Sequence, residues 1–424
     1  MMIYKQKEEE RRWTQDMVSI EKDEFVKSFV GTEHDEFLKF ISEVDKDSRW
    51  LICPLKEIKF KTAAETAAED LFIGSEDAYR DTLYSPLPLI GVLPGGKEVC
   101  FRSYLWKQVK QLHRIAAPII TDMMKEGALG AAVEMVNMCG PFLKGDAQVL
   151  LRGGKVSGYA SEYNANWTET EQLSFIEDSF MKRFPDYEFT GGSFSHEMTT
   201  ADYRLGETIA EALDKDSAVL SSYAKAWEDA GMDGDLQQAV PMIRFVTGES
   251  GLTSIILKPF LVLHGKEIPV SPSLAVSHRG TDKTVWGRLG DFPAESLSMF
   301  QLGLAGIETL CNLQVYHPYA CMTHALRTFV NFLPRTMLDD VAESFKVFFD
   351  PSDPTKTCKA IDVFSQINEC IHGIMPTLSA MRKLQAQELI ARLVVMDWKK
   401  MDVSKAIRLR SCKAKETESL FEAA

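Results

Sequence analysis

Three stretches decide the fold, and they read VLLRGGKVSGYASEYN (149–164), YEFTGGSFSHEMTTADYRL (187–205) and MIRFVTGESGLTSIILKPFLVLHGKEIPVSPSLAVSHRG (242–280). Each contains alternating or continuous apolar runs separated by glycines, which is typical of strands joined by turns. They lie in a block from Val149 to Phe292, and most of the remaining chain has helical periodicity. The sequence therefore predicts an α+β fold with a central, largely antiparallel sheet flanked by many helices.

Local signals place elements within this block. The turn Arg152–Gly153–Gly154–Lys155 between two apolar runs predicts a hairpin. Thr168 followed by Glu171 predicts a capping box at the start of a helix whose apolar residues recur at 173, 176, 180 and 184. A second helix is expected over 294–313.

The flanking segments divide the chain into three expected regions. Residues 1–140 are predicted to form a mostly helical N-terminal region, and 141–335 the α+β core with the long strands. Residues 336–424 are predicted to form a helical C-terminal region that ends in a basic tail.

Composition limits the class of protein and its expected cellular location. The 424 residues are 45% hydrophobic and 26% charged, as in ordinary globular proteins. No apolar run approaches the about 20 residues that span a bilayer, and the charged N-terminus lacks the apolar core of a secretory signal. We therefore expect no membrane association and a cytoplasmic location. The net charge of −13 argues against a protein that coats nucleic acid with its whole surface, although a local basic groove stays possible.

The central block resembles a phage- and plasmid-associated family, the domain of unknown function 932. The matching residues are VLLRGGKVSGYASEYN before a helix, and MIRFVTGESGLTSIILKPFLV followed later by SHRG, which cover roughly a third of the chain. The order Glu249–Ser250–Gly251 departs from the family phrase, in which serine precedes glutamate. The resemblance implies a phage, prophage or plasmid source, and the family has no well-defined activity.

The predicted element order gives a second, topological analogy. A strand pair, a helix, three or four long strands and a further helix are similar to the core of single-strand annealing recombination proteins. Those proteins form rings or filaments and hold single-stranded DNA in a basic groove, so the analogy implies homo-oligomers with single-stranded DNA as a partner. Topology alone does not establish function.

Cations and aromatic rings are the side chains that a single strand needs, for its phosphates and bases respectively. The segment 278–288 has four basic side chains and a tryptophan against one acid. We therefore expect the strand to contact Arg279, Lys283, Trp286 and Arg288, with Lys258 and Lys266 as secondary phosphate partners and a further group at Arg102, Trp106 and Lys107. The alternative is a solvated loop whose arginines pair with neighbouring carboxylates.

Metal and catalytic sites receive less support. Cys311, His317, Cys321 and His324 could supply zinc ligands, but their spacing matches no standard finger, and buried cysteines with a hydrogen-bonded histidine are the alternative. The eight cysteines include no CxxC pair, and Gly248–Gly251 lacks the second glycine of a nucleophile elbow. We therefore expect no catalytic residues, metal or cofactor.

The leading hypothesis is non-catalytic nucleic-acid handling in phage or plasmid biology, and the alternative is a phage structural or interaction protein, such as a virion component or a host-defence inhibitor.

Overall fold

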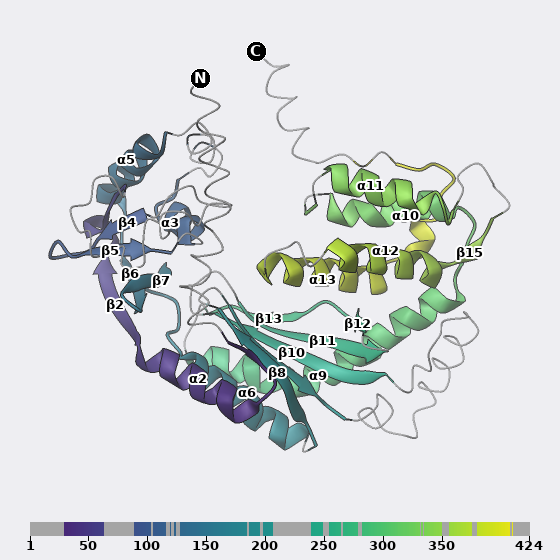
Figure 1. Ribbon diagram of the computed structural model, residues 1–424, viewed down its shortest axis with the longest axis horizontal. Helices are drawn as coiled ribbons and strands as arrows, with labels where there is room; N and C mark the ends of the chain where they lie inside the picture. The colour runs from purple at the N-terminus through teal and green to yellow at the C-terminus, as the bar shows by residue number, and fades with distance from the viewer. Residues whose placement is uncertain are drawn as a thin grey trace, which may run out of the picture.

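The computed structural model describes residues 29–62, 89–102, 105–115, 119, 123, 128–184, 186–195, 198–206, 239–248, 254–263, 266–278, 282–330, 332–333, 335–349, 356–374, 380–407 and 409. It contains helices together with two large sheets in which all but one of the strand pairs are antiparallel (Figure 1). The predicted α+β fold is confirmed.

The first sheet is fully antiparallel and contains the longest strands. Its order is β1-β8-β9-β10-β11, and β11 pairs on its far side with both β12 and β13. The strands span Phe29–Gly31 (β1), Glu188–Phe194 (β8), Thr199–Arg204 (β9), Val240–Thr247 (β10), Ile255–Leu263 (β11), Lys266–Pro269 (β12) and Leu274–Val276 (β13).

The second sheet has the order β2-β6-β7-β5-β4-β3, and its one parallel pair is β5 with β7. The predicted turn at Arg152–Lys155 joins β6 to β7, and Gly153 and Gly154 both adopt the positive φ that such a turn requires. The block predicted as one sheet is thus divided between two. The strands span Ser48–Pro54 (β2), Lys59–Lys61 (β3), Leu89–Val92 (β4), Glu98–Phe101 (β5), Asp146–Arg152 (β6) and Lys155–Ser161 (β7).

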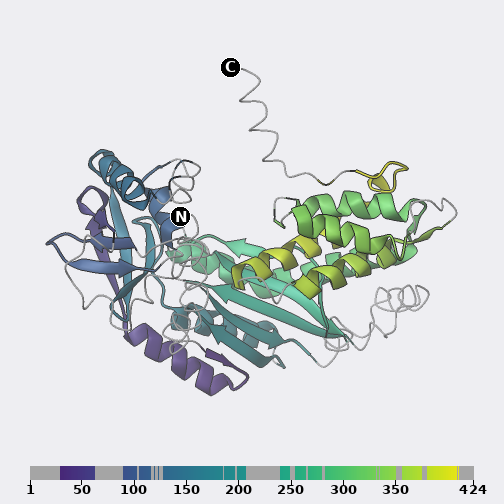
Figure 2. The same ribbon diagram turned by 45° about the horizontal axis from the view of Figure 1, so that its top comes forward.

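Helices pack against both sheets. The first sheet packs on α2 (His34–Lys46), α6 (Glu169–Arg183) and α9 (Asp282–Asn312), with Phe37, Ile176 and Phe300 in the shared core. The second sheet packs on α3 (Trp106–Leu112) and α5 (Leu129–Cys139) around a smaller core. Figures 1 and 2 show the first sheet between the N-terminal lobe, built on the second sheet, and a group of C-terminal helices.

The C-terminal helices follow α9 in the chain. They are α10 (Pro318–Leu326), α11 (Arg335–Phe345), α12 (Ala360–Ile374) and α13 (Ala380–Val394), and a short β14–β15 pair (Gln314–Val315 with Cys358–Lys359) ties α9 to α12. Their buried apolar residues join the core of the first sheet. Among the described residues, no helix has both the length and the apolar character needed to cross a membrane.

The elements cross two of the expected boundaries. The described part of residues 1–140 contains five strands beside its helices, and two of these strands, β2 and β5, pair with β6 and β7 beyond residue 141. The helix expected over 294–313 begins at Asp282, because Val285, Leu289 and Phe292 are buried at helical spacing and Pro293 does not interrupt the helix.

Candidate functional site

The predicted group at Arg102, Trp106 and Lys107 is mostly interior. The Arg102 side chain is buried, and its Nε donates a hydrogen bond to the Ser157 Oγ at 2.9 Å. Trp106 belongs to the core of the N-terminal lobe, whereas Lys107 is exposed on α3. The interior positions of Arg102 and Trp106 differ from the surface position that a contact with nucleic acid requires, because β7 and the packed face of α3 enclose them.

The second predicted group is also divided. Trp286 is half-buried, with its ring centroid 4.5 Å from that of Trp167 and 4.6 Å from that of Phe175, so core packing occupies this ring. Arg288, two residues further along α9, is exposed. Lys258 is fully buried, so it too lies away from the predicted surface. Arg279 lies outside the described residues, as do the side chains of Lys266 and Lys283.

The cysteine and histidine group lies on α9, α10 and the segment between them. Cys311 and Cys321 are buried, and burial raises the pKa of each thiol to about 12. The His317 backbone N–H donates to the Asp402 carboxylate, and the His324 Nε2 lies 3.2 Å from the Lys405 carbonyl oxygen. In the part of the chain that the structure describes, no three His, Cys, Asp or Glu side chains gather as ligands of a metal ion would.

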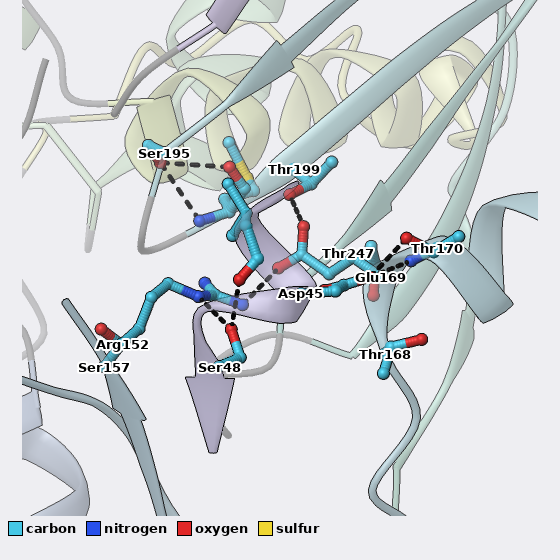
Figure 3. A network of polar contacts seen from close by, with 12 residues as sticks. Asp45, Ser48, Arg152, Ser157, Thr168, Glu169, Thr170, Ser195, Thr199 and Thr247 are labelled. Carbon is cyan, nitrogen blue, oxygen red and sulfur yellow. Dashed lines mark hydrogen bonds and ion pairs between the residues drawn. The ribbon is translucent and has the colours of Figure 1, made fainter. Parts of the chain in front are cut away.

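A polar network, here called the junction network, lies where the two sheets meet (Figure 3). Arg152 at the end of β6 and Glu169 at the start of α6 are almost fully buried, with Nη2 and Oε1 3.8 Å apart. The Arg152 Nε donates to the Ser48 Oγ at 2.9 Å, and the Thr199 hydroxyl donates to the Glu169 carboxylate. The guanidinium also lies 5.4 Å from the centre of the Phe194 ring. The buried ion pair between Arg152 and Glu169 therefore contacts residues of both sheets.

The N-terminus of α6 strengthens this network. Thr168 and Glu171 form the predicted capping box, which satisfies two otherwise unpaired backbone N–H groups. Glu169 occupies the first turn, where the positive end of the helix dipole favours a carboxylate. Asp45 of α2 accepts hydrogen bonds from the backbone N–H and the hydroxyl of Thr170, so α2 is tied to the same helix end. The arrangement fixes α2, α6 and the two sheets relative to one another.

A second polar cluster, here called the α13 seat, lies on the opposite face of the first sheet. Arg244 of β10 binds the Asp202 carboxylate of β9 through Nε and Nη2 at 2.7 and 2.8 Å, and its Nη2 donates to Glu267 of β12 at 2.9 Å. Gln387 of α13 accepts a hydrogen bond from the Lys258 Nζ at 2.9 Å and donates to Glu267 at 2.7 Å. The helix thus lies over the sheet through polar contacts.

Lys258 is the unusual member of the α13 seat. It stands directly opposite Arg244 in the β10–β11 register, and like charges at such positions repel. Burial and the neighbouring Arg244 charge together lower the pKa of Lys258 to about 7, although Glu388, Glu267 and Asp202 act in the opposite direction. Near neutral pH this side chain is divided between its charged and neutral forms.

Sequence reasoning missed both clusters. The signal available was the charge that interrupts the apolar runs at Arg152, Asp202, Arg244 and Lys258. Register decides what these charges meet: Arg244 is directly opposite both Asp202 and Lys258, and α13 supplies the remaining partner from more than a hundred residues away in sequence. Both clusters have the geometry of anchors that join separate elements through buried or half-buried polar groups.

Comparison with known proteins gives no match. No family model matches the chain, and neither a curated protein nor a solved structure matches it. The resemblance to the domain of unknown function 932 therefore stays a prediction.

Proposed function

We propose that this protein binds single-stranded nucleic acid without catalysing a reaction on it, in the biology of a phage or plasmid and in the host cytoplasm. The observation that supports the proposal best is the element order: the β6–β7 hairpin, α6, the antiparallel strands β8 to β11, and the long α9. This is the order on which the analogy to single-strand annealing proteins rests. The same analogy makes a homo-oligomer part of the proposal.

Three basic residues with exposed or half-exposed side chains would make the proposed contact. Lys107 is exposed on α3, and Lys110 one turn later is half-buried with a pKa lowered by its burial and by the Lys107 charge. Figure 1 places α3 on the side of the N-terminal lobe that faces the C-terminal helices. Arg288 is the exposed cation of the second predicted group. Phosphate binding would relieve the repulsion between the two lysines, since an anion adds an opposite charge to both.

A salt-titrated binding assay with fluorescently labelled single-stranded DNA tests the proposal. We expect binding at low salt that weakens steeply as salt is raised, because bound phosphates release counterions. Lys107→Glu and Arg288→Glu should each weaken binding and lower the slope of log K against log[salt] by about 0.7 per lost phosphate contact. Lys346→Glu is the matched control, since it reverses an exposed charge in the turn directly after α11, among the C-terminal helices. No binding at low salt, or equal binding by all three variants, would refute the proposal.

Exposed apolar side chains favour the second candidate, a protein-interaction or virion function. On the N-terminal lobe, Ile52, Met138 and Phe142 are 68%, 73% and 84% exposed, and apolar groups of this kind often mark protein contacts. Size-exclusion chromatography with mass measurement separates the two candidates. An annealing protein should form rings or filaments, whereas a monomer that forms a stoichiometric complex with a host or virion protein and binds no DNA would favour the second.

A further inference from the structure

Helix α13 contacts strands β10 to β12 through polar side chains, while Ile390 and Leu393 of the same helix lie in the apolar core. Gln387 is nearly fully buried and its side-chain amide joins three partners on three strands: Lys258 at 2.9 Å, Glu267 at 2.7 Å and Arg244 at 3.4 Å. The next residue, Glu388, accepts hydrogen bonds from the backbone N–H and the hydroxyl of Ser273 at 2.9 and 2.7 Å. The strength of such a contact depends on the charges of its members far more than that of an apolar contact does.

The amino group of Lys258 lies under this contact, and α13 helps to keep it from water. Lys258 is 1% exposed, and its nitrogen points to Gln387. When α13 lifts from the sheet, water reaches that nitrogen, and the lysine regains its ordinary preference for the charged form. Protons therefore bind more tightly to the open state than to the closed state.

We propose that α13 is a pH-responsive cover on the polar face of the first sheet, held closed while Lys258 is neutral and loosened when Lys258 takes up a proton. Opening exposes the strand face that carries Asp202, Arg244 and Lys258, so acidification uncovers a polar surface that is closed at alkaline pH. The device is independent of whether the protein binds nucleic acid.

The groups around Lys258 set the pH at which the response levels off. Arg244 on β10 opposes its protonation, while Asp202 on β9, Glu267 on β12 and Glu388 on α13 favour it. Burial outweighs these charges and gives a closed-state pKa of about 7. A further titratable neighbour is His372 of α12, which acts on Glu267. The opening equilibrium should therefore rise as the pH falls from about 10.4, the ordinary pKa of lysine, to about 7, and level off below that.

The size of the response follows from the two pKa values. With a pKa of about 7 in the closed state and about 10.4 once water reaches the amine, the opening equilibrium should be roughly thirty-fold larger at about pH 6 than at about pH 8.5. The sign follows because the open state binds more protons, so lowering the pH favours it. Below about pH 6 the closed state is also protonated and the response levels off.

Hydrogen exchange of the full chain, corrected for the intrinsic pH dependence of amide exchange, measures this equilibrium directly. We expect peptides covering α13 to lose about thirty-fold in protection between about pH 8.5 and pH 6, while peptides covering β10 change much less. Protection of α13 that does not vary with pH would overturn the proposal. Parallel changes in α13 and β10 would also overturn it, because the proton would then be taken up on unfolding of the whole sheet.

Two variants identify the sensor. Lys258→Met should remove the pH response of α13, and His372→Gln should retain the response over the same pH range. A response lost in His372→Gln would contradict the assignment to Lys258. Should Lys258→Met fail to fold, the wild-type profile and the His372→Gln profile still decide the proposal, since neither depends on that variant.

Discussion

Replacing Arg152 by methionine tests whether the junction network holds the two sheets together. The ion pair with Glu169 has a separation of 3.8 Å and side chains only 1% and 2% exposed. At an effective dielectric constant of about 20, charges at that separation attract by roughly 4 kcal/mol. Arg152→Met leaves the charge of Glu169 buried beside the Thr199 hydroxyl, which donates a hydrogen bond to it. The substitution also removes the hydrogen bond from Arg152 to Ser48. We expect the free energy of unfolding to fall by about 3–5 kcal/mol.

Guanidinium denaturation followed by tryptophan fluorescence measures this loss. Arg392→Met is the matched control, because Arg392 is 58% exposed and pairs with Glu388 on the surface of α13, where such pairs contribute about 1 kcal/mol or less. In a double-mutant cycle, Arg152→Met combined with Glu169→Gln should cost clearly less than the sum of the two single changes. A loss below about 1 kcal/mol for Arg152→Met, or simple additivity in the cycle, would refute the reasoning.

Three further predictions concern single elements. Thr168→Ala removes the capping box shared with Glu171 and should lower the free energy of unfolding by about 1 kcal/mol by chemical denaturation, whereas unchanged stability would show that α6 does not depend on it. Burial lowers the pKa of His113 to about 4, so stability should fall as pH drops from about 6.5 to 4, and His113→Phe should flatten that part of a thermal-melting profile. Gly192→Ala would place its Cβ 2.8 Å from the Phe37 ring and should cost about 1–3 kcal/mol, while a neutral result would show that the ring can move.

Much of the local structure could be predicted from the sequence because the signals are local. The glycines of the β6–β7 turn and the Thr168–Glu171 box act within a few residues, and both appear where the sequence places them. The α+β class also follows, since the periodicity of the apolar residues changes between segments. The early start of α9 could not be predicted as readily, because Pro293 is ordinarily a sign of a helix boundary and the packing of Trp286 against Trp167 and Phe175 is long-range.

The candidate site was harder to predict than the fold. A lysine in a strand has the same sequence signature whether it faces water or a helix, and only the arrival of α13 makes Lys258 an interior group. Arg102 is buried for a similar reason, since its partner Ser157 lies on a strand of the other hairpin. The exposed Lys107 and Arg288 remain consistent with the surface positions that the sequence indicated. Contacts between distant segments thus decide which charges are available to a ligand.

Crosslinking gives the most direct test of nucleic-acid binding. The full chain would be irradiated with photoreactive single-stranded DNA at low salt, and the crosslinked peptides would be identified by mass spectrometry. We predict crosslinks in peptides containing α3 and the first turns of α9, which carry Lys107 and Arg288, and their loss when unlabelled single strand is added in excess. Crosslinks confined to other segments, or none above the level of an unrelated acidic protein, would contradict the proposed function.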